Sequence, residues 1–416
     1  MLIVPSEFRN ILDSQMTTPY ITFIYKSANK TAYIEDYGTI NRRGDSLTSG
    51  DLIFPLRNSD KIWNDIIANP ANHFLQEGEI RLGFNQDYNQ TWDDMNQTWD
   101  STTKLWDYYY SITLFKGKLE NARFNDDKVD LSFKDRMQYF SVRKIGNGEY
   151  PVNYATSEWN PADLVWEILT VYGGLSDITD DTNPDIDYTA WSNWKAIMES
   201  LGYKIKGYFT GQNITTILQS ICNITASSIY TEGNGKIRCA YWLQQDTAIV
   251  YEYTESNKEG IILLDIDRLS VINKYQVFYG YTPSTQAWGG NVIVEDSNSQ
   301  SEYGVLEEVY DDTDVWHANV SSATSFAERR LDETKEPKKE IQFTTYLMGF
   351  TQQVQDGIKV TDSFHGFTEQ PVKIENLSFN VNNFKVVITG SLTTLFHIFI
   401  LDDEYYGEMD SQNGLA

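Results

Sequence analysis

The sequence has few of the residue types on which most catalytic and metal sites depend. Its 416 residues include only four histidines, His73, His317, His365 and His397, and no pair of them has the spacing of a zinc-binding motif. The phosphate-binding loop, Gly-x-Gly-x-x-Gly, His-Glu-x-x-His and Gly-x-Ser-x-Gly are absent. We therefore expect no catalytic residues, no metal site and no bound cofactor.

Cysteine and long apolar runs are also scarce. The only cysteines are Cys222, on an apolar helical stripe, and Cys239, in a strand pattern, which predicts two buried thiols rather than a disulfide framework. The longest apolar stretch, 395–401, contains His397 and is far shorter than the roughly 20 residues of a membrane helix. With no basic, then apolar, leader, we expect a chain made in the cytoplasm and not anchored in a membrane.

Positive charge is in the minority. Lys and Arg number 33 against 59 Asp and Glu, a formal net charge of −26, which argues against tight wrapping of nucleic acid. The richest basic stretch is interleaved with acidic residues and predicts a solvated helix face. Its basic residues are Arg329, Arg330, Lys335, Lys338 and Lys339.

What the sequence does contain is strand and turn patterning. Apolar residues alternate with polar ones in many short segments that are bounded by Gly, Asn and Asp. Turns are predicted at 125–127 and 382–383. The clearest predicted strands are 112–119, 128–133, 273–279, 340–347, 372–379 and 384–389.

Three segments have helical periodicity instead. Asn160 and Pro161 start the first helix as cap and first residue, and Gly173-Gly174 end it. The second helix spans 213–225 and precedes a hairpin around 233–235. The third spans about 322–334 and ends before Pro337. Together these patterns predict a β-rich α+β fold with two β-barrel or β-sandwich domains and a mixed α/β middle region.

Turn-rich stretches suggest the domain boundaries. We expect a first β-domain at 1–147, a mixed domain at 148–255, a second β-domain with one helix at 256–400, and a flexible acidic tail at 401–416.

A short repeat interrupts the first of these domains at about 85–110. Asn-Gln-Thr-Trp-Asp occurs twice, and Trp92, Trp99 and Trp106 are seven residues apart. The repeat is either an insertion that docks on its own domain or a neighbouring subunit, or a surface that contacts a partner or a glycan. A carbohydrate-binding or glycan-cleaving β-protein that uses these tryptophans is thus an alternative function.

Two other features keep alternatives open. The acidic segment 177–187 has enough oxygen atoms for calcium but lacks the glycine and the final glutamate of an EF-hand loop, so an acidic solvated loop is favoured. Carboxylates are abundant enough for a glycosidase pair, but no particular pair is indicated.

The order of segments along the chain resembles the tail-hub, or baseplate-hub, proteins of tailed bacteriophages, phage-tail-like particles and gene transfer agents. One part of the resemblance is a hairpin at 114–137 that ends in Asp135-Arg136. The other segments that carry it are 40–45, 53–60, 74–82, the helices starting at Asn160 and Asn213, 232–238, 273–280, the helix starting near Ser322, 354–361 and 384–390.

The resemblance implies a structural virion protein without enzymatic activity. Hubs of this family are trimers in which each chain supplies two tail-tube-like β-domains, so that three chains present six domains to the hexameric tail tube. A trimer of this kind contacts a tail tube or distal tail protein on one side and a spike, fibre or tape-measure protein on the other. Its lumen forms part of the DNA-ejection channel. Its location would be the virion tail tip.

Overall fold

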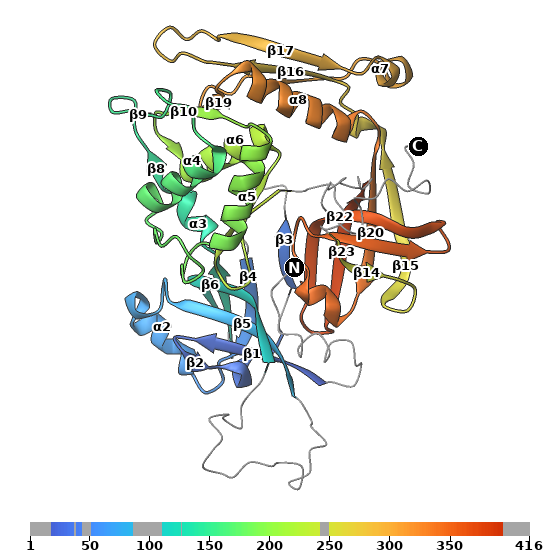
Figure 1. Cartoon of the computed structure of the whole chain (residues 1–416). Helices are drawn as coiled ribbons and strands as arrows, with labels where there is room; N and C mark the ends of the chain where they lie inside the picture. Colours follow the sequence, from blue (N-terminus) through green and yellow to red (C-terminus); the bar gives the residue numbers. More distant parts are fainter. Residues whose placement is uncertain are drawn as a thin grey trace, which may run out of the picture.

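The computed structural model describes residues 18–36, 39–43, 51–85, 110–125, 127–241 and 249–393. Figure 1 shows three groups of elements: a sheet from the first part of the chain at the lower left, a sheet from the last part at the right, and a mixed region above the first sheet. A hairpin and a long helix from residues 274–334 lie across the top of this view. The β-rich α+β class expected from the sequence is confirmed.

The first sheet has six antiparallel strands in the order β2-β1-β5-β6-β7-β4. Alternation places Phe23, Phe54 and Phe133 on its inner face, where the rings of Phe23 and Phe54 meet edge-on at 4.7 Å between centroids. Its strands are β1 (Thr18–Tyr25), β2 (Ala28–Asn29), β4 (Asp51–Arg57), β5 (Glu77–Asn85), β6 (Tyr110–Asn125) and β7 (Lys128–Lys134).

Short helical turns accompany this sheet. Hydrogen bonds hold these turns against the sheet. His73 Nε2 lies 2.7 Å from Asp65 Oδ2, and the Tyr25 hydroxyl donates to the His73 carbonyl at 3.1 Å. The turns are η1 (Thr31–Tyr33), η2 (Ile62–Asn64), α2 (Asp65–Ala68) and η3 (Pro70–Asn72).

The last sheet runs in the order β14-β21-β22-β23-β20-β15 and curls into a half barrel (Figure 1). β14 and β15 are its two ends although only residues 254–257 separate them in the chain, so the sheet must curl to bring them together. Its strands are β14 (Ile249–Tyr253), β15 (Lys258–Asp267), β20 (Lys338–Thr345), β21 (Gly357–Asp362), β22 (Phe367–Asn380) and β23 (Lys385–Leu392). The turn η8 (Leu347–Thr351) follows β20.

One strand joins the two sheets. β3 (Thr39–Arg43) comes from the first part of the chain but pairs antiparallel with β22, with Ile40 opposite Phe379. Both of these side chains are buried, and the apolar cluster that contains them is continuous from Phe23 to Ile388. The two β-rich ends of the chain therefore share one hydrophobic core.

The mixed region has a second core around Trp194, Ile217 and Phe326. Its helices are α3 (Met137–Phe140), α4 (Pro161–Glu167) with a π-helical turn η5 (Ile168–Tyr172), α5 (Tyr188–Ser200), α6 (Ile214–Thr225), α7 (Ser297–Tyr303) and α8 (Val320–Thr334). Its strands are β8 (Lys144–Ile145), β9 (Val152–Asn153), β10 (Ile205–Phe209), β11 (Gln212–Asn213), β12 (Ser228–Thr231), β13 (Ile237–Ala240), β16 (Lys274–Tyr279), β17 (Gly290–Glu295), β18 (Glu307–Tyr310) and β19 (Val315–His317).

Strands from both sides of the expected boundary at 255/256 share the mixed sheet, since β10 pairs with β19. Tyr275, Val277 and Phe326 also pack in the same core as Ile217 of α6. The connection between this unit and the last sheet is made by β15, the turn η7 (Arg268–Ser270) and the return through Pro337 to β20. The division of the chain into domains stays a prediction.

The predicted local elements agree with the structure. The predicted strands correspond to β6, β7, β16, β20, β22 and β23. Asn160 caps α4 by accepting from the Ala162 amide at 2.9 Å, and Gly174 follows the helical segment with φ +70°, which glycine adopts readily. α6 leads into the β12–β13 hairpin, and α8 ends before Pro337.

Two expectations need correction. The pattern did not reveal α5, which begins at Asp187, whose side chain accepts from the Ala190 amide. The basic stretch is not simply a solvated face: the Arg329 guanidinium lies over the Tyr241 ring at 4.6 Å, and Arg329 and Arg330 both pair with Glu333 at 3.1 Å. Packing on Tyr241 therefore buries much of this side of α8. Among the described helices, none is long and apolar enough to cross a bilayer.

Candidate functional site

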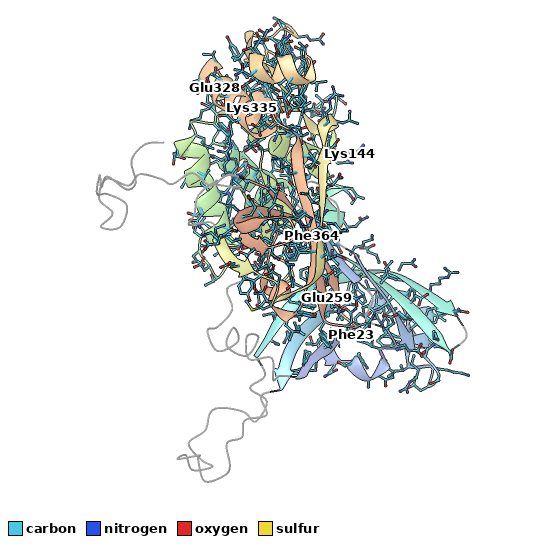
Figure 2. All side chains as sticks on the ribbon, turned by 90° about the vertical axis from the view of Figure 1, so that its right-hand side faces the viewer. Phe23, Lys144, Glu259, Glu328, Lys335 and Phe364 are labelled. Carbon is cyan, nitrogen blue, oxygen red and sulfur yellow. The ribbon has the colours of Figure 1, made fainter. Side chains whose placement is uncertain are left out.

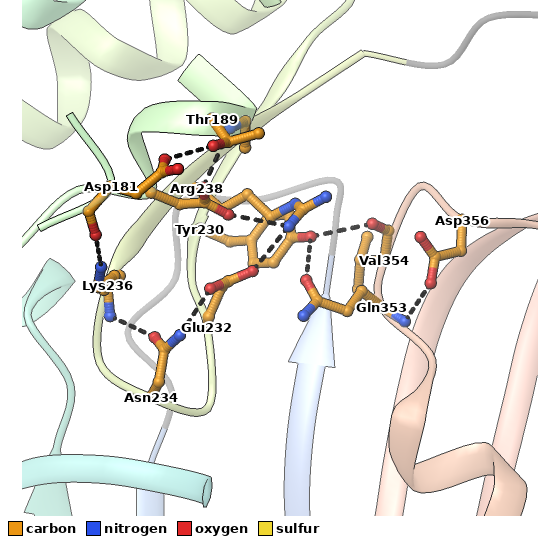
Figure 3. A network of polar contacts seen from close by, with 12 residues as sticks. Asp181, Thr189, Tyr230, Glu232, Asn234, Lys236, Arg238, Gln353, Val354 and Asp356 are labelled. Atoms are coloured by element: carbon orange, nitrogen blue, oxygen red, sulfur yellow. Dashed lines mark hydrogen bonds and ion pairs between the residues drawn. The ribbon is translucent and has the colours of Figure 1, made fainter. Parts of the chain in front are cut away.

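The tryptophans that the sequence singled out are not part of the site described below. Trp92, Trp99 and Trp106 lie outside the described residues. Their role in partner or glycan contact stays a prediction. The most elaborate polar arrangement in the described part of the chain is the junction between the β12–β13 hairpin and the loop before β21, shown in Figure 3.

Arg238 of β13 is the centre of this junction. Its Nη1 lies 2.9 Å from Glu232 Oε1 and 3.0 Å from Asp187 Oδ2, and the Glu232 side chain is only 4% exposed. Burial opposes the charge on Arg238, but the neighbouring Tyr230, Glu232 and Asp187 outweigh it and raise the pKa of the guanidinium. The guanidinium therefore stays charged throughout the ordinary pH range.

The hairpin turn is tied to the acidic loop and to α5. Asn234 donates to Glu232 Oε2 at 2.9 Å and accepts from the Lys236 amide at 2.8 Å, as Figure 3 shows. Lys236 Nζ reaches the Asp181 carbonyl at 3.4 Å, and the Thr189 hydroxyl donates to the Asp181 carboxylate. These contacts fix the turn before it meets the last sheet.

Tyr230 makes the connection to the last sheet. Its hydroxyl lies 3.0 Å from the Val354 carbonyl and 3.2 Å from Gln353 Oε1 (Figure 3). The Gln353 amide in turn donates to Asp356 Oδ2 at 2.7 Å, and Gln355 Nε2 donates to Ser228 Oγ at 2.9 Å. Strand β12, through Ser228 and Tyr230, is thus hydrogen-bonded to residues that are more than 120 positions away in the chain.

A small cavity of about 140 Å³ lies beside these contacts. Its walls come from α5, β13 and the loop before β21, and include Asn193, Trp194, Arg238 and Asp356. This volume is well below the several hundred Å³ of typical small-molecule sites. The arrangement is suited to holding the mixed region and the last sheet in a fixed orientation rather than to binding a cofactor.

Among the described residues, the structure brings a serine and a histidine into hydrogen-bonding contact, which the spacing of the histidines in the sequence did not predict. His317 Nδ1 lies 2.8 Å from Ser322 Oγ, at the start of α8. Ser322 Oγ also accepts from the Lys204 amide at 2.9 Å and donates to its carbonyl at 3.1 Å. Both side chains are at most 1% exposed, so this pair cannot reach a substrate. It serves to join β19 and α8 to the strand that begins at Ile205.

The two thiols are buried and not bridged, as expected. Burial raises the pKa of Cys222 to about 12 and that of Cys239 well above its usual range. Neither sulfur can act as a thiolate nucleophile in the folded protein.

The acidic segment 177–187 uses its carboxylates within the fold. Asp185 pairs with Arg136 and accepts from the Ser176 amide, Asp187 pairs with Arg238, and Asp180 accepts from Thr182. In the described ranges, no group of three or more His, Cys, Asp or Glu side chains is placed to hold a metal ion.

Comparison with known proteins gives the fold its context. No protein-family model and no curated protein sequence matches the chain. Several solved structures match about nine-tenths of it, among them two tail proteins. The 43 kDa tail protein of prophage MuSo2 from Shewanella oneidensis covers 91% of this chain and 98% of its own length, with a TM-score of 0.51 and 11% identity. The tail protein from Neisseria meningitidis MC58 covers 90% and 96%, with a TM-score of 0.55 and 10% identity.

This chain has the fold of phage tail proteins. The sequence resemblance to tail hubs is therefore confirmed at the level of the fold. Residues that hold this fold together at the junction, Tyr230, Gln353 and Asp356, were not identified from the sequence. Glu232 and Arg238 lie at the two ends of a predicted hairpin turn, but no local sequence pattern indicates that Asp187 lies beside them.

Proposed function

We propose that this chain is the tail hub of a tailed bacteriophage, a structural virion protein at the tail tip. In this proposal three copies form a ring that adapts the hexameric tail tube to a threefold spike, fibre or tape-measure end. The ring surrounds part of the channel through which DNA is ejected, and it assembles in the host cytoplasm.

The observation that carries the proposal is the presence of two large curved sheets in one chain. The six-stranded sheet β2-β1-β5-β6-β7-β4 and the half barrel that ends in β14 and β15 share one apolar core. Three copies would present six such sheets, the number that a hexameric tube requires. A rigid relation between the two sheets is necessary for this, and β3 supplies it by leaving the first part of the chain to pair with β22.

The net charge and the burial of the reactive side chains in the described part of the chain fit the same role. Three copies at −26 each would carry a formal charge of −78, and a strongly acidic channel repels a phosphate backbone. Of the described residues, His73, His317, Cys222 and Cys239 are buried within the fold, which favours a role without catalysis.

The test is the symmetry of the purified particle in negative-stain images. A threefold ring with an open centre and a face of near-sixfold symmetry is the expected result. Particles that remain compact monomers at tens of micromolar protein would contradict the proposed trimer.

The glycan-binding alternative rests on Trp92, Trp99 and Trp106 alone. A glycan-array signal that disappears in a Trp92→Ala, Trp99→Ala variant would favour it over the hub. A silent array together with binding to a tail-tube ring would favour the hub.

A further inference from the structure

β15 is an edge strand with an unusual surface. Of the strands that the structure describes, only β20 pairs with it. Ile262 points into the core and is 1% exposed, but Ile261 and Leu263 on either side of it are 66% and 64% exposed. Further along, Ile266 is 55% exposed and Leu269, in the turn after β15, is 86% exposed.

The exposure follows from the geometry of the half barrel. The pairing of β15 with β20 shifts register between Glu259 and Leu263. Beyond this irregularity the two strands run from the half barrel toward the mixed region (Figure 1). Leu264 lies on the face of the ribbon that carries Ile341, whereas Leu263 lies on the opposite face, with Gln342. Apolar side chains therefore stand on both faces of this ribbon. Figure 1 places β15 at the right-hand margin of the molecule, and Figure 2 looks onto that side, with Glu259 near the lower middle of the view.

Such an edge is costly for a protein that remains alone. An open strand offers backbone donors and acceptors to another chain, and soluble proteins usually protect it with charges, proline or a covering segment. Here the exposed apolar side chains from Ile261 to Leu269, with Ile262 buried among them, leave on the order of 500 Å² of apolar surface that is divided between the two faces of the ribbon.

We infer that β15 is the strand through which one copy of this chain docks on the next, against the outer face of the first sheet of that copy. The inference rests on the proposed trimer and names its contact. A closed ring of three cannot use one patch against itself, because a threefold ring requires two different surfaces that fit each other.

The distribution of charge along the chain favours the first sheet as the second surface of the contact. Residues 1–147 carry 17 basic and 20 acidic side chains, whereas residues 148–416 carry 16 and 39. The part of the chain that contains β15, with Asp265 and Asp267 along the strand, is thus strongly acidic, and the first part is nearly neutral. Contact between unlike parts is favoured over contact between two acidic ones.

The outer face of the first sheet also has the required composition. On β4, Ile53 is 55% exposed and points away from the buried Leu52 and Phe54. Arg57 of β4 is exposed and stands opposite Lys128 of β7. Lys128 is ion-paired with Glu35 at 2.6 Å, so Arg57, four residues along β4 from Ile53, is the cation that this face offers to a strand with leucines and aspartates.

The test compares two variants with substitutions of the same kind by native mass spectrometry across a concentration series. Leu263→Asp, Ile266→Asp should raise the concentration at half assembly about 100-fold or more, since it places charges in the centre of the contact. Ile293→Asp is the matched control: Ile293 is 52% exposed on β17, outside the proposed contact, and its trimer should remain.

A second measurement covers the case in which the double variant fails to fold. The native cysteines are buried, so Leu263→Cys and Ile53→Cys copies each carry one accessible thiol. A short bis-maleimide should join them in a mixture of the two copies and in neither copy alone.

The outcomes separate the two proposals. A folded double variant that stays trimeric, or cross-linking within the Leu263→Cys copy alone, would refute the β15 contact while the trimer stands. A wild-type chain that is monomeric throughout would refute both.

Discussion

Protonation of His317 at acid pH is expected to lower the free energy of unfolding. The imidazole is 1% exposed and packs against Phe326 at 5.1 Å between ring centroids. Ser322 Oγ already donates to the Lys204 carbonyl, so Nδ1 of His317 must donate to Ser322 Oγ. Nε2 has no hydrogen-bond partner. Protonation would thus place a new N–H and a charge in an apolar core without an acceptor.

The sign and size follow from this environment. Burial lowers the pKa of His317 to about 3, from its ordinary value of 6.5. A proton therefore binds the unfolded chain more tightly than the folded one, so the contribution is fully present above pH 6.5 and is lost as the pH falls toward 3. At pH 5 the loss amounts to about 2 kcal/mol, at about 1.4 kcal/mol for each pH unit below 6.5.

Urea unfolding at pH 7.5, 6 and 5 measures this directly, with the wild type compared with His317→Gln. Glutamine can still donate to Ser322 but cannot be protonated, so the gap between the two proteins should shrink by about 2 kcal/mol from pH 7.5 to 5. Ser322→Ala controls for lost packing and should lower the stability by a similar amount at each pH. A gap between wild type and His317→Gln that is the same at all three pH values would refute the reasoning.

Three other outcomes can be checked by unfolding or labelling. Arg238→Met should cost about 3 kcal/mol in urea unfolding because it leaves the buried Glu232 carboxylate without its cation, and adding Glu232→Gln should recover much of the loss. Burial, with the charge of a neighbouring carboxylate, raises the pKa of Asp314 to about 6, so ionisation at pH 7 opposes folding. Asp314→Asn should therefore stabilise by on the order of 2 kcal/mol at pH 7, and the gain should vanish near pH 4. Cys222 and Cys239 should react with a maleimide only after unfolding, and labelling of the native chain within minutes would contradict their burial.

Elements that depend on near neighbours in the chain could be predicted from the sequence. A cap and a proline at Asn160-Pro161, and the asparagines at 382–383 between two alternating segments, act within a few residues. The helix α5 could not be predicted, because its cap Asp187 ends a run of acidic residues typical of a loop and because its apolar side consists of Trp191, Trp194 and Met198 among polar residues. Only their packing against the second core reveals that they share a face.

Long-range pairing could not be predicted in the same way. β3 pairs with β22 across more than 330 residues, and Tyr230 meets Gln353 across 123. No short pattern specifies such partners, because edge strands with alternating residues can pair with many others. The candidate site at the junction depends wholly on these contacts, which is why its residues became visible only in the structure.

The distribution of titratable groups leads to the same view of function. His73 bonds to Asp65 and Tyr25, and Lys258 forms an ion pair with Asp362 at 2.7 Å in which both side chains are at most 4% exposed. Each of these contacts joins elements of one chain, and the Lys258–Asp362 pair is closed to a substrate. The described surface keeps instead an apolar edge at β15, which the proposed contact with a second copy would cover. Under the proposed function, selection for assembly accounts for both features.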